Sequence, residues 1–160
     1  MRIVIGAVGR MKAGAERDLL ARYVDRAQKL GRQIGLGGPD LVEIDESRAP
    51  TAAQRQDDEA VRLLRNSPSG CKVIVLDERG KALSTQEFTE ILTTWRDHGT
   101  PSVLLTLGGP DGQGAAIRDA AQLTLSFGRL TWPHMLARIM LAEQVYRVMT
   151  VMAGHPYHRE

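Results

Sequence analysis

Two near-continuous apolar runs constrain the fold of this chain most strongly. They are KVIVL at 72–76 and SVLLTL at 102–107. A strand with one solvated face alternates apolar and polar residues, whereas a strand covered on both faces reads as an uninterrupted β-branched run. Sheets of this kind are typical of parallel strands connected by helices. We therefore expect an α/β fold with a mainly parallel sheet flanked by helices.

The remaining periodicity places further strands and helices in alternating order. Gly31 is expected to end the first helix, and Ser84 with Glu87 has the spacing of a capping box that opens the third. Since the sequence contains no linker or repeat, residues 1–160 are expected to form a single domain. The further predicted strands are 2–8, 40–44 and 123–127, and the predicted helices are 15–30, 52–66, 84–98, a short one after 114, and a long closing one to about 152.

Composition excludes several classes of protein. Apolar residues make up 42% of the chain and charged residues 25%, a balance too hydrophobic for a disordered chain. The single Cys71 rules out an internal disulfide and a cysteine-rich zinc site. No apolar stretch approaches the roughly 20 residues that span a bilayer, and the amino terminus lacks the apolar region of a signal peptide. We expect a cytoplasmic protein without a metal or a membrane partner.

Three loops follow predicted strands and are candidates for a ligand site, because ligands of parallel α/β sheets bind at the carboxyl ends of the strands. They come after Leu76, at 108–114 and at 128–133. The glycine loop at 108–114 matches no phosphate-binding motif, and Asp111 would repel a phosphate. A ligand with a positive centre, such as S-adenosylmethionine (AdoMet), suits it better. A simple strand-to-helix turn is the competing interpretation.

The closing helix carries an arginine in an unusual position. Four polar residues form one stripe, and Arg138 projects instead from the apolar remainder with His134 one turn earlier. A permanently charged guanidinium there needs a partner, a ligand or water, so a structural ion pair competes with a functional role. The broad apolar surface predicts a homodimer packed through this helix, unless the monomer buries the helix by itself. The polar stripe consists of Glu143, Gln144, Arg147 and Thr150.

The tail HPYHRE at 155–160 combines aromatic, cationic and imidazole side chains. Tyr157 and Arg159 can lie flat on an unstacked base, as recognition of single-stranded RNA requires. His155 and His158 lack a third nearby ligand for a metal. Terminal residues are commonly frayed, which is the alternative for this segment.

The ordered series LDERGK (76–81), LTLGGPDG (105–112), LSFGRLTWPHMLARIMLAEQVYR (125–147) and HPYHRE resembles the ribosomal RNA large subunit methyltransferase H family, a small member of the SPOUT class. This resemblance implies a deep trefoil knot at the carboxyl end and AdoMet bound in a homodimer. It further implies methylation at N3 of a pseudouridine in helix 69 of 23S rRNA, on the assembled ribosome. The implied cofactor-binding residues are Leu76, Gly108, Gly109, Pro110, Gly128, Arg129, Leu130, Thr131, Trp132 and Pro133.

The resemblance does not settle the catalytic base. His134, His155 and His158 are candidate proton acceptors, Arg138 is the candidate electrostatic element, and Tyr157 with Arg159 would hold the base. A net charge of +2 is small for a protein that binds naked RNA, which favours a structured ribosomal target. A SPOUT-like enzyme acting on tRNA, a non-catalytic ribosome-associated factor and a nucleotide-binding domain are the alternatives.

Overall fold

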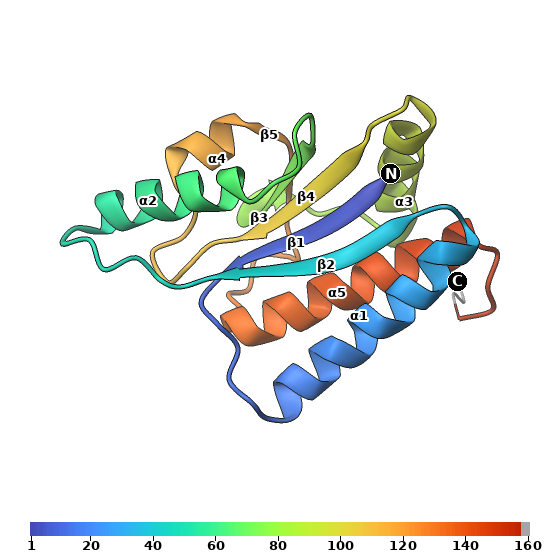
Figure 1. Cartoon of the computed structure of the whole chain (residues 1–160), viewed down its shortest axis with the longest axis horizontal. Helices are drawn as coiled ribbons and strands as arrows, with labels where there is room; N and C mark the ends of the chain where they lie inside the picture. The colour runs from blue at the N-terminus through green and yellow to red at the C-terminus, as the bar shows by residue number, and fades with distance from the viewer. Residues whose placement is uncertain (158–160) are drawn as a thin grey trace.

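The computed structural model describes residues 1–157, and they form an α/β fold around a parallel sheet (Figure 1). The strand order is β2-β1-β4-β3-β5, and every pairing is parallel. The fold class predicted from the two apolar runs is therefore confirmed. The elements are β1 (Arg2–Val8), α1 (Ala15–Gln33), β2 (Gly37–Ile44), α2 (Ala52–Arg65), β3 (Lys72–Lys81), α3 (Thr85–Asp97), β4 (Ser102–Leu107), α4 (Ala115–Asp119), β5 (Ala121–Leu125) and α5 (His134–Met152).

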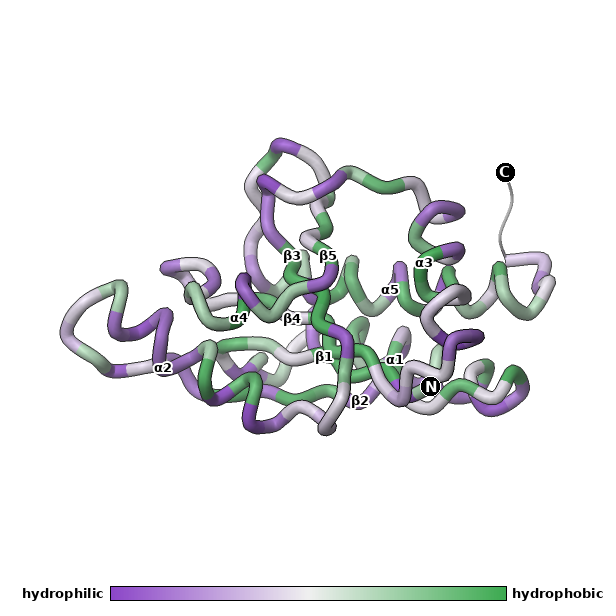
Figure 2. The backbone as a smooth tube through the Cα atoms, turned by 90° about the horizontal axis from the view of Figure 1, so that it is seen from above, coloured by the Kyte–Doolittle hydropathy of each residue, from purple (hydrophilic) through white to green (hydrophobic). Residues whose placement is uncertain are grey.

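Helices cover both faces of the sheet, so the strands have no solvated face at their centre. The larger core packs β1 and β4 residues such as Ile5 and Leu105 against α1, α3 and α5. The smaller core packs Val8, Val73 and Val75 against α2 and α4. Figure 2 shows the apolar strands in the middle of the molecule, with hydrophilic segments at the periphery. Every β4 residue is buried, as its uninterrupted sequence predicts.

Helix α1 continues past Gly31, where the sequence predicted its end. Gly31 lies inside the last turn, and the residue that ends the helix is Gly35, whose φ of 71° is the left-handed conformation. The Leu36 amide donates to the Gly31 carbonyl at 2.8 Å, which closes a Schellman-type turn. Gly31 has a different task, because a Cβ there would lie 2.8 Å from the Leu36 carbonyl oxygen. It is a close-packing glycine.

Strand boundaries were predicted less well than strand positions. β2 begins at Gly37, where a loop was expected, because Gly37 already pairs with Arg2. β3 continues through 77–81 beyond its apolar run, since Lys81 pairs with Leu125 after an irregularity. β5 is shifted two residues toward the amino terminus. Polar edge segments of this kind are stabilised by a neighbouring strand that local periodicity does not reveal.

Capping explains where α2 and α3 begin. The predicted box at α3 is confirmed, because the Glu87 amide donates to Ser84 Oγ at 3.1 Å and the Ser84 amide donates to the Glu87 carboxylate at 2.7 Å. Hydrogen bonds from Ser84 to this carboxylate, chiefly the one from its backbone amide, lower the pKa of Glu87. Thr51 and Gln54 form an equivalent box at α2 that the sequence reading missed.

Because Gly31 lies so close to the Leu36 carbonyl, we expect a Gly to Ala substitution there to destabilise the protein, although the same change stabilises an ordinary helix. In an ordinary helix, Gly to Ala stabilises by about 1 kcal/mol. Here the added Cβ meets backbone, and we expect Gly31→Ala to lower the free energy of unfolding by about 1–3 kcal/mol in denaturant titration. Ala21→Gly on the exposed face of α1 is the control, with a cost of about 1 kcal/mol from propensity alone. A stabilised Gly31→Ala variant would contradict this account.

Candidate functional site

The three loops predicted from the sequence meet around one cavity of about 560 Å³, called the loop cavity here. Its walls come from the end of β3, the glycine loop after β4 and the segment between β5 and α5. All strands run in the same direction, so their carboxyl ends meet at one edge of the sheet. A volume between about 300 and 1,000 Å³ is typical of small-molecule sites.

Local hydrogen bonds hold the two flexible walls in place. In the glycine loop, the Gly112 amide donates to the Gly109 carbonyl at 2.9 Å, and the buried Gln113 donates Nε2 to the Thr106 carbonyl at 3.0 Å. In the other wall, Ser126 Oγ bonds to the Glu78 carbonyl at 3.1 Å and accepts from the Gly128 amide at 3.1 Å. The wall before α5 is thereby fastened to the end of β3.

Most residues predicted to bind the cofactor line this cavity. Arg129 and Pro133 are exposed and are not among its lining residues. His134, predicted as a candidate proton acceptor, lies at the first turn of α5 and lines the cavity. The predicted cofactor-binding residues that line it are Leu76, Gly108, Gly109, Pro110, Gly128, Leu130, Thr131 and Trp132.

Several lining residues were missed. Asp77, Glu78 and Arg79 directly follow the apolar run of β3, so their position at a strand end was a usable signal. Gln56 and Arg118 come from α2 and α4, and their distance from the loops in sequence gave no such signal. The cavity therefore offers both signs of charge as well as backbone groups.

The charge of Asp111 is not free to meet a ligand as the sequence reading supposed. Arg55 Nε and Nη2 donate to the two carboxylate oxygens of Asp111 at 2.7 and 3.1 Å. The Arg55 guanidinium holds the pKa of Asp111 below its usual value, chiefly through this hydrogen bond. Asp111 therefore does not provide the free negative charge that was expected to select a cationic ligand, since Arg55 already pairs with it.

Arg138 does not point into the loop cavity, although its neighbour Ala137 lines it. Its side chain is only 4% exposed and forms an ion pair with Glu43. Nη2 also donates to the carbonyls of Val8 and Gly9, at 2.9 and 3.0 Å. Burial lowers the pKa of Arg138, and Glu43 opposes that effect. The placement corresponds to the structural ion pair, and a direct role on reacting atoms is disfavoured.

The tail up to Tyr157 packs against α5 rather than near the loop cavity of the same chain. The Tyr157 ring lies 4.8 Å from that of Tyr146, and the Arg147 guanidinium lies 5.4 Å from the Tyr157 ring centre. Desolvation, followed by the nearby Glu143 carboxylate, raises the pKa of Tyr157. Twelve residues of helix separate His134 from Tyr146, about 18 Å at 1.5 Å per residue. His155 is exposed, and His158 and Arg159 lie outside the described residues.

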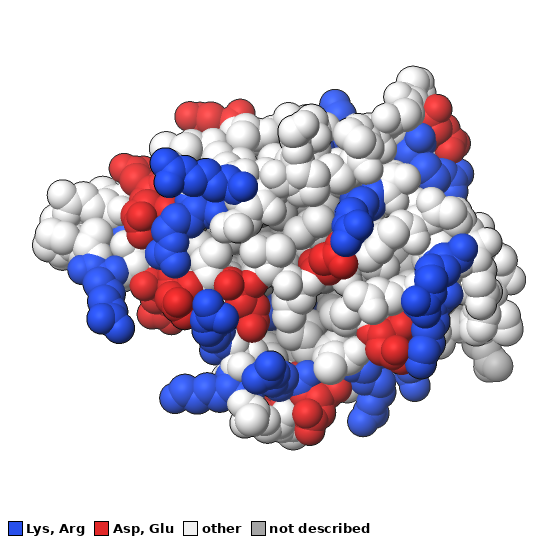
Figure 3. All heavy atoms as spheres, viewed as in Figure 1, with Lys and Arg blue, Asp and Glu red and all other residues white. Residues whose placement is uncertain are grey.

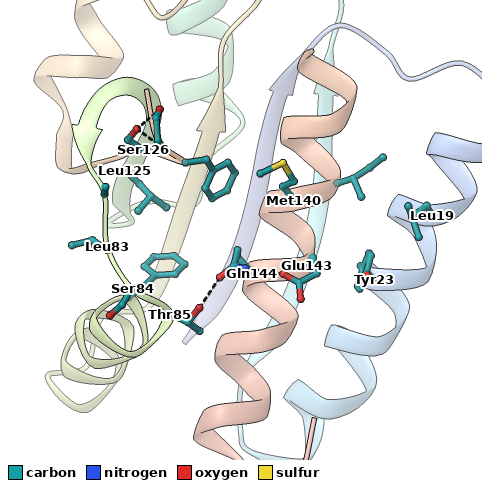
Figure 4. Close-up of a pocket in the computed structure, with 15 residues that line it drawn as sticks. Leu19, Tyr23, Leu83, Ser84, Thr85, Leu125, Ser126, Met140, Glu143 and Gln144 are labelled. Atoms are coloured by element: carbon teal, nitrogen blue, oxygen red, sulfur yellow. Dashed lines mark hydrogen bonds between the residues drawn. The ribbon is translucent and has the colours of Figure 1, made fainter. Parts of the chain in front are cut away.

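A second hollow of about 740 Å³, called the helix groove here, lies between α1, α3 and α5 (Figure 4). Tyr23 and Met140 face it from α1 and α5, and Thr85 Oγ1 bonds to Gln144 Oε1 at 3.1 Å across it. It adjoins the loop cavity, because Phe127 and Gly128 line both.

Most of the apolar surface of α5 is buried by the chain itself. The helix packs against α1 and α3 and shares the larger core with the sheet, and even Thr150 of the predicted polar stripe is fully buried. The part left open is its first turn and the preceding segment. Leu130 is 72% exposed, and Trp132, Met135 and Leu136 are each more than 40% exposed. The apolar surface that remains for a partner is thus smaller than the sequence suggested, and it borders the loop cavity.

The face of the molecule shown in Figure 3 carries acidic and basic side chains interspersed, with no field of a single sign. Within residues 1–157, no helix is long and apolar enough to cross a membrane. In the same range, no group of three or more His, Cys, Asp or Glu residues is placed to hold a metal ion.

Comparison with known proteins identifies the family. A family model described as predicted SPOUT methyltransferase matches residues 1–158. Curated proteins named ribosomal RNA large subunit methyltransferase H are 50% identical in Xanthobacter autotrophicus and 51% identical in Bartonella henselae, each over 99% of both chains. This chain belongs to that family of SPOUT methyltransferases.

Solved structures similar to this SPOUT methyltransferase support the fold alone. A probable methyltransferase from Bordetella pertussis Tohama I has a TM-score of 0.50 at 14% identity, covering 92% of this chain and 95% of that one. A hypothetical protein has a TM-score of 0.53 at 13% identity, covering 94% and 81%.

The cofactor of SPOUT methyltransferases is AdoMet, and the loop cavity fits it. AdoMet carries a sulfonium, an amine and a carboxylate but no phosphate. The cavity provides the carboxylates of Asp77 and Glu78 and the cations of Arg79 and Arg118, and none of the described residues that line it is a lysine. Its volume also suits a ligand of this size.

The Glu43–Arg138 pair yields a stability prediction for this methyltransferase. Removing one partner of a buried pair leaves an unpaired charge, so Glu43→Leu should cost about 3–5 kcal/mol in denaturant unfolding. The double variant Glu43→Leu with Arg138→Met, which has no buried charge, should recover at least half of the loss. A cost below about 1 kcal/mol for Glu43→Leu would show that the pair does not hold α5 to the sheet.

Proposed function

We propose that this chain methylates N3 of a pseudouridine in helix 69 of 23S rRNA, with AdoMet as the methyl donor. The proposal includes the assembled ribosome as substrate, a homodimeric enzyme and a cytoplasmic location. It also includes residues 1–160 acting as one domain, with the deep trefoil knot that the family resemblance implies. The relatives named ribosomal RNA large subunit methyltransferase H, matched over nearly their whole length, support the rRNA substrate.

One observation carries the proposal: three loops from distant parts of the chain enclose a single cavity with a histidine at its rim. Bound AdoMet would supply an electrophilic methyl group on a sulfonium. Leu76, Gly109 and Thr131 represent the three walls that would hold it. Because positioning supplies much of the rate in a transfer between two bound reactants, fixed walls matter for catalysis.

The proton on N3 of the pseudouridine has to leave, and His134 is the best-placed candidate acceptor among the described residues. It lines the cavity and is exposed, so an incoming base can reach its imidazole. Trp132 beside it is 42% exposed and offers a flat surface for stacking a base. His155, His158, Tyr157 and Arg159 complete the proposed set from the tail.

Helix geometry supports assigning the tail to the partner subunit. Tyr157 docks about 18 Å along α5 from His134, so the tail of a chain starts far from its own cavity. The exposed apolar residues around the start of α5 border the cavity and offer a surface for a second copy. A dimer packed there can bring the tail of one subunit to the cavity of the other.

Mapping the modified nucleotide tests the substrate. Ribosomes from a strain that lacks this protein should gain one methyl group on a pseudouridine of helix 69 when the purified enzyme and AdoMet are added, as measured by mass spectrometry of the rRNA. Separated subunits, bulk tRNA and a helix 69 oligonucleotide serve as comparisons. Preferential methylation of tRNA would favour the alternative target, equal methylation of the oligonucleotide would refute the ribosome requirement, and no incorporation would favour a non-catalytic factor.

Mixing two inactive variants tests the shared site. Leu76→Arg places a cation in the cavity but keeps the tail, whereas a chain truncated after Gly154 keeps the cavity. If the tail acts in the partner's site, an equal mixture refolded together should regain about a quarter of the wild-type rate, because half of the dimers are mixed and each holds one complete site. Absence of rescue, with dimers confirmed by light scattering, would place both parts in one subunit.

A further inference from the structure

Helix α2 is packed unusually closely against the glycine loop of the loop cavity. The Gln56 side-chain amide donates to the Asp111 carbonyl, and a Cβ added to Gly114 would lie 2.3 Å from the Gln56 carbonyl oxygen. Two different groups of Gln56 therefore touch the two halves of the loop. No motif in the sequence connects residues 55–59 with the loop, and only the fold brings them together.

The side chain of Arg55 fixes the tip of the same loop. Its two bonds to Asp111 have the parallel geometry of a bidentate guanidinium–carboxylate pair, which constrains direction as well as distance. Nη1 of Arg55 also donates to the Ala49 carbonyl at 3.1 Å. One side chain thus connects the glycine loop to the segment after β2.

Glu59, one turn further along α2, is a buried carboxylate behind the loop. Its exposed fraction is 4%, and its Oε1 accepts from the Ser47 amide at 2.8 Å. A Cβ added to Gly109 would lie 2.9 Å from Oε2 and 3.0 Å from a methyl group of Val8. A side chain at position 109 would therefore press on the Glu59 carboxylate and on Val8, whatever it contacts in the cavity.

From these contacts we propose that Arg55, Gln56 and Glu59, called the α2 clamp here, position the glycine loop for the cofactor. Arg55 and Glu59 are positioning residues, since neither lines the cavity, while Gln56 and Asp111 line it. The inference rests on the proposed binding of AdoMet in the loop cavity. None of the cofactor-binding residues predicted from the sequence lies on α2. The inference is that this helix nevertheless controls the affinity for the cofactor.

The α2 clamp should raise the fraction of molecules in which the glycine loop has the conformation that binds the cofactor. Four glycines within 108–114 make the loop flexible when it is unrestrained. Apparent affinity falls in proportion to the fraction of molecules in the competent conformation. Loss of the Arg55 fork should therefore weaken cofactor binding without changing any atom in contact with the cofactor.

Arg55→Gln is the main test, with Arg62→Gln as its matched control. Arg62 lies on the same helix and loses a comparable ion pair, its bond to Asp58 at 3.2 Å, but it does not contact the glycine loop. We expect Arg55→Gln to raise the AdoMet Kd about five- to tenfold in calorimetry, with Arg62→Gln within about twofold of wild type. Arg55→Lys keeps the charge but loses the fork and should lie between them.

Kinetics separate positioning from general destabilisation. The KM for AdoMet should rise in Arg55→Gln while the KM for ribosomes stays unchanged, whereas partial unfolding would lower the active fraction without altering either KM. Glu59→Gln, which keeps an oxygen for the Ser47 amide, should shift the AdoMet KM in the same direction.

An AdoMet Kd for Arg55→Gln equal to that of Arg62→Gln would overturn the clamp while leaving the proposed function intact, provided that the wild-type protein binds AdoMet. Failure of the wild type to bind AdoMet would overturn both. If Glu59→Gln does not fold, the comparison of Arg55 with Arg62 still decides the question.

Discussion

Parallel pairing of β3 with β4, in register from Lys72 opposite Val103 to Val75 opposite Thr106, is the constraint on which the site depends. Parallel strands deliver their carboxyl ends to one edge, so residues 76–79 and 107–113 must meet although about 30 positions separate them. The helices that cover both faces of the sheet shield β3 and β4 from solvent. The third wall of the cavity, the segment between β5 and α5, is positioned by the pairing of β5 with β3 and by the bond from Ser126 to the end of β3.

Two arginines form ion pairs that connect distant segments on the two faces of the sheet. Arg55 and Arg138 approach the glycine loop and the end of β1 from opposite faces of the sheet, and each is paired with a carboxylate distant in sequence. Arg55 is partly exposed, so its bidentate geometry matters more than its Coulomb energy. Arg138 is buried, and removing its partner leaves an uncompensated charge. Arg55 thus holds the glycine loop, and Arg138 holds the end of β1, through polar contacts outside the apolar core.

The sequence predicted the parallel sheet, its helices and the three loops because those features are encoded locally, in periodicity, capping residues and strand-end glycines. Its errors concern contacts between distant segments. Asp111 was interpreted as a free charge, and no partner could be named for Arg138, because Arg55 lies 56 positions and Glu43 95 positions away. Gly31 was interpreted as a helix end because the carbonyl of Leu36 that excludes its Cβ is fixed by tertiary packing. The family resemblance supplied the expected substrate, which no local pattern specifies.

The position of Tyr157 connects the size of the chain to its assembly. The described residues 1–157 form one α/β fold around a single sheet, so in the proposed function the substrate contacts come from the rim of the cavity and from the tail. Tyr157 packs on Tyr146 and Arg147, about 18 Å along α5 from His134. If Tyr157 keeps this position, the second subunit of the proposed dimer would bring the equivalent residues to the cavity. In the proposed homodimer, the second subunit would then complete the active site as well as add stability.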